Sequence, residues 1–486
     1  MNQPRVPKGT PARGGQWAEV RRPEGADLSR HYHLDLNTTT RAALDVIITD
    51  LGAAGGEVTV VGGSVRDLLL GLPAHDLDLE VSGLDMGRVR QIMANKFSLD
   101  ETGVSFSVLK VRVPKSSDVI DIALPRTEEL TGAGHRDFEV TPDHHLDFAT
   151  AASRRDFTIN AIGLNPTTGE LLDPFGGEAD LAAGILRHVS DKFSEDPLRP
   201  LRAARFAGRF GFIIAPETVD LCRAMRPLAD ELPPERIWGE LSGILSSTSP
   251  GRSLQALVEI DWIDVFPELA ALRGVEQDPG WHPEGDAFTH TAHVLDYAAA
   301  HLAFENDDDR LVVMTAAMCH DLGKSTSTEF RDGRVRSHGH EAAGVPLTTS
   351  LLHRLGQVAL TKDVAPLVEH HLAPVTLTTD KAIRRLSTKV PRLDLLVLVS
   401  KADVGGRPPL TNTESLAKID AFSEKVRQLG VHEGPPKMLA RGDHLITMGL
   451  TPGPQFRELL GAVYDAQLDG VVTTEDEAVT MLRGLV

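Results

Sequence analysis

The stretch Val60–Val81, VVGGSVRDLLLGLPAHDLDLEV, contains a glycine turn, an early arginine and two aspartates two residues apart. The residues around its start, EVTVV at 57–61, are typical of a strand, and the glycines predict a sharp turn into a short helix. Free backbone N–H groups at a helix start, with Arg66 beside them, favour phosphate binding. The stretch therefore predicts a strand, a turn, a short helix and a second strand around an anion site.

The second strand of this stretch carries its acidic residues on one face. Because side chains alternate along a strand, Asp76 and Asp78 point to one side and the two leucines to the other, buried side. The same alternation in VIDIAL, at 119–124, isolates Asp121 as a third carboxylate expected on that side. Neighbouring carboxylates repel one another unless a divalent cation lies between them, so we predict a metal site. A solvated acidic strand is the alternative reading of the aspartate pair alone.

Composition limits the class of protein. A chain of 486 residues with 41% hydrophobic and 24% charged residues is an ordinary globular protein of three or four domains, at about 100–200 residues each. The net charge of −19 argues against general nucleic-acid binding but leaves room for a local basic groove. Cys222 and Cys319 alone predict no disulfide framework. We see no apolar membrane span or signal core, and we expect a cytoplasmic protein without a membrane partner.

A third segment combines a helix start with a row of arginines. Ser194–Pro197 predicts Asp196 as N-cap and Pro197 as the first helical residue. The predicted helix, Leu198–Phe210, has no acidic residue, and one stripe of it carries four arginines, namely Arg199, Arg202, Arg205 and Arg209. A solvated face is the usual reading of such a run, and Asp196 alone is readable as a simple cap. The four arginines would nevertheless repel one another without an anionic partner, which favours a phosphate ligand.

Together these segments predict a site for a nucleoside triphosphate. The carboxylates would hold two divalent ions, and the arginines and the glycine turn would hold the phosphates. One ion would activate a 3′-hydroxyl group while the other steadied the leaving pyrophosphate. The predicted chemistry is nucleotidyl transfer.

The motifs GGSVRD with DLD, RRDFTINA, DPFGGEADL and EDPLRPLRAARF resemble those of class II tRNA nucleotidyltransferases, the CCA-adding enzymes, in order and spacing. The run ALPRTE after Asp121 is similar to bacterial members that carry an HD domain, and the resemblance covers about residues 55–410. It implies that Asp76 and Asp78 ligate Mg²⁺. It also implies contacts to the incoming nucleotide from Gly63, Arg66, Arg155, Arg202 and Arg205.

The same resemblance implies how the base and the RNA are recognised. Asp196 and Arg199 match the pair that hydrogen-bonds the base edge of CTP or ATP, so that protein acts as the template. The partner implied is the tRNA acceptor arm, held by shape and backbone over a limited basic surface.

A second motif lies further along the chain. His320 and Asp321 in CHDLGK, with His290 upstream and Asp403 in KADVGGR, resemble the H…HD…D set of HD phosphohydrolases. Each histidine alone would be structural, but the set predicts a divalent metal, either a transition metal or Mg²⁺. Further residues expected to line the site are His338, His340 and His370. The resemblance implies removal of phosphates, including 2′,3′-cyclic phosphates, from RNA ends.

The predicted fold class is α+β, with a small mixed-sheet, polymerase-beta-like nucleotidyltransferase head followed by an all-helical neck, an HD domain and a tail. The predicted parts are a disordered extension (1–36), the head (37–165), the neck with the nucleotide-selecting helix (166–275), the HD domain (276–410) and a helical tail (411–486). The polar run at 128–147 predicts a mobile loop.

We therefore expect a Mg²⁺-dependent, template-independent enzyme that adds C, C and A to tRNA from CTP and ATP, with an appended phosphohydrolase. Partial CC or A addition and poly(A) synthesis remain alternatives, because the motifs do not separate them. A rival of another class is an HD phosphohydrolase of nucleotides or RNA ends whose head only binds. The sequence leaves the oligomeric state open.

Overall fold

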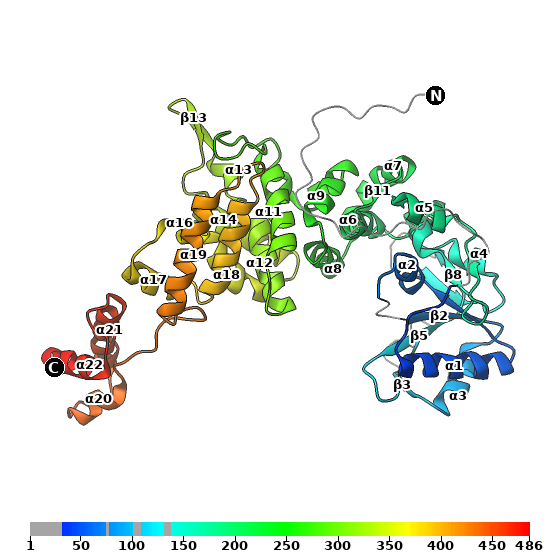
Figure 1. The fold of residues 1–486 in the computed structure, drawn as a ribbon, viewed down its shortest axis with the longest axis horizontal. Coiled ribbons are helices and arrows are strands. Elements are labelled where there is room, and N and C mark those ends of the chain that lie inside the picture. The colour runs from blue at the N-terminus through cyan, green and yellow to red at the C-terminus, as the bar shows by residue number, and fades with distance from the viewer. Residues whose placement is uncertain (1–31, 74–76, 101–107, 131–137) are drawn as a thin grey trace. The chain divides into compact units, whose positions relative to one another are not determined.

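The computed structural model describes residues 32–73, 77–100, 108–130 and 138–486. The chain divides into two compact units, Met1–Leu232 and Pro233–Val486, which are described separately. The described part of the first unit contains one mixed sheet with helices, and that of the second is helical apart from one hairpin (Figure 1). The predicted α+β class is confirmed.

The first unit is built on a seven-stranded sheet with the strand order β3-β4-β5-β2-β1-β8-β9. Its strands are β1 (Glu57–Val61), β2 (Leu77–Ser82), β3 (Ser98–Asp100), β4 (Val108–Arg112), β5 (Val119–Ala123), β8 (Gly163–Leu164) and β9 (Leu171–Leu172). β2 is antiparallel to β1 and parallel to β5, so the sheet is mixed. The strand that carries the aspartate motif is therefore an interior strand.

Alternation along the strands explains how the sheet buries one face. Leu77, Leu79 and Val81 of β2 are buried in one core cluster, whereas Asp78 and Glu80 between them are only half-buried. Helices α1 (Thr38–Ala53) and α3 (Met86–Ala94) contact each other and contribute to the same core (Figure 1). The polar side chains are thus left on the other face of β2.

The extension predicted to be disordered is partly ordered against the head. Residues 1–31 lie outside the described residues, but the Tyr32 hydroxyl donates to Glu178 Oε1 at 3.1 Å. Leu34 is buried in the head core, with Leu36 packed beside it. The prediction of disorder is wrong for residues 32–36, because Tyr32, Leu34 and Leu36 alternate along the chain and pack in or against the head core.

A hairpin occupies part of the run that we predicted to be a loop. β6 (Arg126–Leu130) pairs antiparallel with β7 (Phe138–Pro142), while residues 131–137 lie outside the described part of the chain. The prediction of a loop is therefore wrong for residues 128–130 and 138–142, which form strands. The polar composition led us to overlook two short segments with β-propensity. Their backbone N–H and C=O groups form hydrogen bonds with each other.

The rest of the first unit is helical, with one short strand pair. Its elements are α2 (Gly63–Leu69), α4 (Phe148–Ala152), η2 (Thr158–Asn160), α5 (Gly177–Ala183), β10 (Ile185–Leu186), η3 (Asp191–Glu195), α6 (Arg199–Phe210), β11 (Ile213–Ile214), α7 (Pro216–Ala224) and η4 (Arg226–Glu231). Helix α6 begins two residues later than its predicted cap requires, with Leu198 as N-cap. Asp196 instead ends η3, and its Oδ1 accepts from Leu198 N at 3.0 Å. Pro200, rather than Pro197, takes the first-turn position.

The second unit opens with α8 (Pro234–Leu245) and α9 (Pro250–Glu259), each of which starts at a proline, a residue that fits the first turn of a helix. After them come η5 (Ile263–Val265) and α10 (Pro267–Ala270). A Cβ at Gly251 would lie 2.3 Å from Ala292 O, so α9 crosses α11 in close contact only because this residue is glycine. Residues 233–259 thus pack with the helices that follow them.

The histidine-bearing helices form the centre of the second unit. Its main members are α11 (Ala287–His301), α12 (Asp307–Cys319), α14 (His340–Arg354), α15 (Thr361–His370) and α18 (Leu393–Gly405). Shorter elements are α13 (Lys324–Ser327), the hairpin β12 (Glu329–Arg331) and β13 (Arg334–Arg336), η6 (Val358–Leu360), α16 (Ala373–Thr376) and α17 (Asp380–Ser387). α18 contacts α11, α12 and α15, and its contact with α11 brings together His290 and Asp403, which are 113 residues apart.

The tail is helical, as predicted, and its helices are α19 (Thr413–Gln428), α20 (Gly442–Thr447), α21 (Pro454–Leu468) and α22 (Glu475–Leu485). The last three of these helices share a small core of their own. Leu445, Val463 and Leu482 are fully buried in this core.

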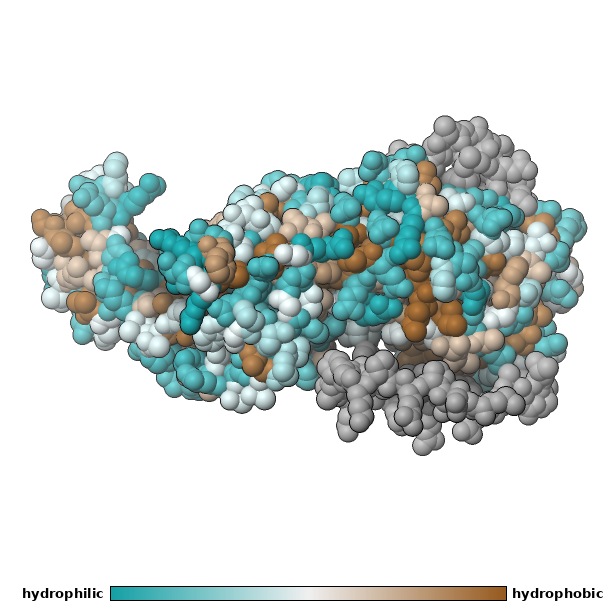
Figure 2. All heavy atoms as spheres, turned by 90° about the horizontal axis from the view of Figure 1, so that it is seen from above, coloured by the Kyte–Doolittle hydropathy of each residue, from teal (hydrophilic) through white to brown (hydrophobic). Residues whose placement is uncertain are grey.

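On the face drawn in Figure 2, hydrophobic residues lie in separate groups among hydrophilic ones. Within the described residues, no helix combines the length and hydropathy needed to cross a bilayer.

Two candidate active sites

The first candidate site lies on the polar face of the head sheet. Asp78 of β2 is directly opposite Asp121 of β5, and parallel register places both on the same face. Asp121 accepts from Lys110 Nζ at 2.6 Å, and this hydrogen bond raises the pKa of Lys110. Asp76, the other predicted metal ligand, lies outside the described residues. The structure therefore brings together two of the three predicted carboxylates.

Glu80 adds a carboxylate that the sequence reasoning missed. It lies two residues after Asp78, on the same face of β2, and its Oε2 is 3.4 Å from Arg155 Nη2. Burial raises the pKa of Glu80, while Arg155 opposes that shift. The alternation that identified Asp78 extends to Glu80 and was sufficient to find it.

The glycine turn lies against these groups. Gly62 has φ of 72°, a conformation that favours glycine, and a Cβ there would be 3.4 Å from Asp78 Oδ2 and 3.5 Å from Arg155 Nη1. Gly63 opens α2 directly after it. The turn, Asp78 and Arg155 therefore line one small region of the head.

Arg66 has partners within the protein. It is buried, its Nε donates to Asp67 Oδ1 at 2.8 Å and its Nη1 donates to Asn160 Oδ1 at 2.7 Å. Its guanidinium also lies 4.8 Å from the centroid of the Phe210 ring. Burial lowers the pKa of Arg66. Arg66 lies on the short helix after the glycine turn, as predicted, but its side chain turns into the packing against α6, and its contact with a nucleotide stays a prediction.

The arginine stripe of α6 also has partners within the protein. Arginines that pair with protein acids do not need the external anion that we expected from the sequence. Arg202 donates twice to Asp156 Oδ2, at 2.9 and 2.6 Å, and Arg209 lies 3.7 Å from Asp67 Oδ2. Asp156 is buried; burial alone would raise its pKa, but Arg202 and its hydrogen bonds hold that pKa below the usual value. The acids that the helix lacks come from other segments, which a local reading could not supply.

Arg199 and Arg205, the other two predicted contacts on α6, differ in their surroundings. Arg199 donates to the backbone oxygens of Lys192 and Arg154, both at 2.7 Å, which ties α6 to the RRDFTINA segment. Burial lowers the pKa of Arg199. Arg205 is half-buried with its guanidinium 4.7 Å from the centroid of the Phe206 ring. Asp196, half-buried before the helix, completes the predicted set.

The second candidate site is a buried histidine and aspartate cluster. His290 Nε2 lies 3.1 Å from Asp403 Oδ1 and 3.3 Å from His320 Nε2, and His320 Nε2 lies 3.2 Å from Asp321 Oδ2. On the other side of Asp321, His340 Nε2 lies 3.3 Å from Oδ1. The four residues predicted as metal ligands thus converge, and His340 joins them as predicted.

The tautomers of this cluster favour metal binding. The Nδ1 atoms of His320 and His340 lie 2.7 and 2.8 Å from the backbone oxygens of Ala317 and Ser337. His371 repeats the arrangement, with Nδ1 2.8 Å from Val368 O and Nε2 3.4 Å from His340 Nε2. Since each carbonyl fixes a proton on Nδ1, the Nε2 lone pairs face one another and the carboxylates. This donor set fits divalent metal ions.

The protonation states support the same conclusion. Burial alone would raise the pKa of Asp321, but His320 and Lys324 hold it well below its usual value. In the same way, Arg407 holds the pKa of Asp403 well below its usual value; Arg407 Nη2 lies 2.5 Å from Asp403 Oδ1. Burial, together with His320, lowers the pKa of His371 to about 3. The cluster therefore offers ionised carboxylates and a neutral imidazole at physiological pH.

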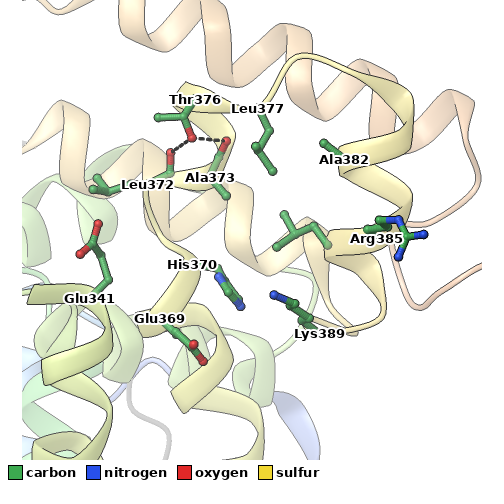
Figure 3. Close-up of a pocket in the computed structure, with 11 residues that line it drawn as sticks. Glu341, Glu369, His370, Leu372, Ala373, Thr376, Leu377, Ala382, Arg385 and Lys389 are labelled. Carbon is green, nitrogen blue, oxygen red and sulfur yellow. Dashed lines mark hydrogen bonds between the residues drawn. The ribbon is translucent and has the colours of Figure 1, made fainter. Parts of the chain in front are cut away.

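His371 was missed, and its neighbour His370 was chosen instead. His370 lies in a second pocket with Glu369 and Lys389 (Figure 3), and none of the cluster residues lines that pocket. The prediction for His370 is wrong because α15 ends there, and the next residue turns inward, where it is 1% exposed. His338 lines the cavity beside the cluster, as predicted.

Glu284 was also missed. Its Oε1 lies 2.7 Å from His290 Nδ1 and 2.9 Å from His282 Nδ1, and its side chain is 1% exposed. Burial alone would raise the pKa of Glu284, but the contacts with His282 and His290 lower it to about 2. His290 thus has a carboxylate as the near neighbour of its Nδ1, where His320, His340 and His371 have a backbone carbonyl. The run HPEGDAFTH at 282–290 did not identify Glu284, because the contact between Glu284 and His290 depends on a turn in the chain between them.

A cavity of about 340 Å³ opens onto this cluster. Asp321, His340, His371 and Asp403 lie on its wall, together with Lys324 and Arg407. Lys324 Nζ lies 2.7 Å from Asp321 Oδ2. Carboxylates for metal ions next to buried cations are the surroundings that a phosphate ester requires.

Comparison with known families matches these sites. Residues 58–187 match the family described as "Poly A polymerase head domain" and residues 287–405 match "HD domain". Between them, residues 211–272 match "Probable RNA and SrmB-binding site of polymerase A". The fold and the two sites thus define a nucleotidyltransferase head joined to an HD domain.

Curated relatives identify the family. The chain is 39% identical over 370 residues to the multifunctional CCA protein of Nitrosococcus oceani, covering 73% of this chain and 86% of the relative. It is 40% identical over 364 residues to that of Laribacter hongkongensis, with 72% and 85% covered. The chain belongs to the family of multifunctional CCA proteins. It is an enzyme, a nucleotidyltransferase, and its two catalytic domain types use divalent metal ions.

Solved structures share the fold. The CCA-adding enzyme of Bacillus stearothermophilus in complex with CTP aligns with a TM-score of 0.65 and 21% identity, covering 93% of this chain and 98% of that one. The Thermotoga maritima CCA-adding enzyme complexed with tRNA aligns with a TM-score of 0.57 and 21% identity, covering 93% and 97%.

Proposed function

We propose that this enzyme adds C, C and A to the 3′ end of tRNA from CTP and ATP, and that its HD domain removes phosphate groups from RNA ends. The observation that carries the first activity is the pairing of Asp78 with Asp121 on adjacent strands, beside a glycine turn. Membership of the multifunctional CCA family supports both activities. We place the enzyme in the cytoplasm, where tRNA is its partner.

In the head, Asp76 and Asp78 would hold Mg²⁺, with Asp121 as the third carboxylate. Bound Mg²⁺ would favour attack by the 3′-hydroxyl on the α-phosphate and steady the leaving pyrophosphate. Lys110 holds Asp121 at 2.6 Å and so fixes the third carboxylate next to Asp78. Arg155 and the N–H groups of the turn at Gly63 would bind the phosphates.

Base selection is proposed for the start of α6. Asp196 and Arg199 would offer an acceptor and donors to the Watson–Crick edge of C or A. The two backbone carbonyls that hold Arg199 fix its guanidinium, which supports a role as a rigid template. Arg205 would contact the nucleotide. Because Arg66 and Arg202 are held by protein acids, we propose that they fix the walls of the site.

In the HD domain, Asp321 and the four histidines around it would hold divalent metal ions. His290 and His320 meet its Oδ2 side, and His340 and His371 lie on its Oδ1 side, a grouping that supports two adjacent sites. Imidazole-rich ligation favours transition metals over Mg²⁺. Ions there would activate water and polarise the phosphate, while Lys324 and Arg407 would bind its oxygens.

The test of the first activity is base incorporation. Full-length protein is incubated with tRNA that ends before CCA, with CTP and ATP labelled in turn. We expect two C residues and then one A, with no further extension. Addition of C alone, A alone or a long A run would identify a partial enzyme or a poly(A) polymerase, and no incorporation would refute the transferase proposal.

A further inference from the structure

Trp281 is an exposed tryptophan at the mouth of the metal-site cavity. Its side chain is 62% exposed, although tryptophan is highly buried on average. The other two tryptophans that the structure describes follow the average, since Trp262 is fully buried and Trp238 half-buried. An exposed aromatic ring beside a cluster of predicted metal ligands requires an explanation.

The position of Trp281 is tied to the cluster. Its backbone N–H donates to Asp278 O at 3.0 Å, which closes a turn, and Nδ1 of the next residue, His282, lies 2.9 Å from Glu284 Oε1. The ring of His282 packs edge-on against that of His290, with centroids 4.6 Å apart. Trp281 is therefore held at a fixed place relative to a predicted metal ligand, even though its ring is exposed.

The lining of the same cavity also includes a partly exposed cation. Arg336, at the end of β13, lines the same cavity and is 38% exposed. Its described ion pair, with Asp332 at 3.7 Å, joins two exposed side chains and is weak. The cavity thus has metal ligands and buried cations on its wall, with an aromatic plane and an exposed arginine at its rim.

We propose that Trp281 is the platform on which the nucleobase of the HD-domain substrate stacks. This inference rests on the proposed phosphohydrolase function. An indole ring binds any base through its face, which suits a site that must accept RNA ends of different sequence. A cavity of about 340 Å³ lies within the range of ligand pockets, about 300–1,000 Å³. Arg336 would pair with a phosphate on the outer side of the nucleotide.

Steady-state hydrolysis by the full chain tests this proposal. The substrates are cytidine 2′,3′-cyclic phosphate and glycerol 1,2-cyclic phosphate, which has the same reacting ring without a base. We expect Trp281→Ala to lower the ratio of the two kcat/KM values about tenfold, through KM for the cytidine compound, and Trp281→Phe to retain most of it. Phe330→Ala is the matched control, because Phe330 is 75% exposed on the neighbouring hairpin but does not line the cavity.

A binding measurement gives a readout independent of turnover. Adenosine 2′-phosphate should quench tryptophan fluorescence of the metal-free wild-type chain, and Trp281→Phe should abolish that saturable quenching. An unchanged substrate ratio in Trp281→Ala, or quenching that survives in Trp281→Phe, would overturn the inference. If the wild type hydrolyses neither substrate, the phosphohydrolase proposal fails, and the quenching result alone decides whether a base binds at Trp281.

Discussion

Replacing Glu284 by glutamine should weaken metal binding by the HD domain without unfolding it. Three histidines of the cluster place Nδ1 within 2.8 Å of a backbone carbonyl, whereas the Nδ1 of His290 has the Glu284 carboxylate as its near neighbour, at 2.7 Å. A charged acceptor makes the imidazole a stronger ligand and fixes its orientation. Glutamine keeps the shape but loses the charge.

The expected size of this effect follows from the burial of the pair. The Glu284 side chain is 1% exposed, so solvent does not screen its charge. Loss of such a partner to a metal-bound histidine costs about 10- to 100-fold in metal affinity. Because the contacts with His282 and His290 overcome burial and lower the pKa of Glu284 to about 2, the carboxylate is charged throughout neutral pH. The loss should therefore be the same across that range.

The assay is competition between the full chain and a chromophoric chelator for Ni²⁺ or Co²⁺, with the Co²⁺ absorption spectrum as a second readout. Glu341→Gln is the matched control. Glu341 Oε2 lies 3.5 Å from His340 Nδ1, which already has Ser337 O at 2.8 Å. An unchanged Kd in Glu284→Gln, or an equal loss in Glu341→Gln, would refute the reasoning.

Three further predictions concern stability. Burial raises the pKa of Asp296 to about 6. The folded state therefore loses stability as the pH rises from the pKa of Asp296 in the unfolded chain to above 6. Asp296→Asn should raise the free energy of unfolding at neutral pH by about 1–2 kcal/mol in urea titrations. Gly323→Ala should lower the melting temperature and the metal content, because a Cβ there would lie 2.0 Å from His340 O; the strain is about 1–3 kcal/mol. Asp156→Asn should cost about 2 kcal/mol in urea titrations of the full chain and weaken CTP binding in equilibrium dialysis, since it removes the charge partner of Arg202. An unchanged unfolding midpoint in any of these variants contradicts its prediction.

Local periodicity explains what could be predicted. Strand alternation over two runs located Asp78 and Asp121, and the sheet places them opposite each other. These signals lie within one segment, so the sequence contains them whole.

The misses depend on contacts between distant segments. The acids that pair with Arg202 and Arg209 come from other parts of the unit, so the arginine stripe looked unpaired in sequence. The choice between His370 and His371 depended on where one helix ended. Glu284 reaches His290 only because the chain turns between them. Each is a property of the tertiary fold.

The central claim is that one chain contains two separate active sites. It is tested most directly by measuring, on the same preparations, incorporation of labelled CTP and ATP into tRNA lacking CCA and release of phosphate from a nucleoside 2′-phosphate. We predict that Asp78→Ala abolishes incorporation and leaves phosphate release at the wild-type rate, and that His320→Ala does the reverse. Loss of both activities in either folded variant would contradict the account.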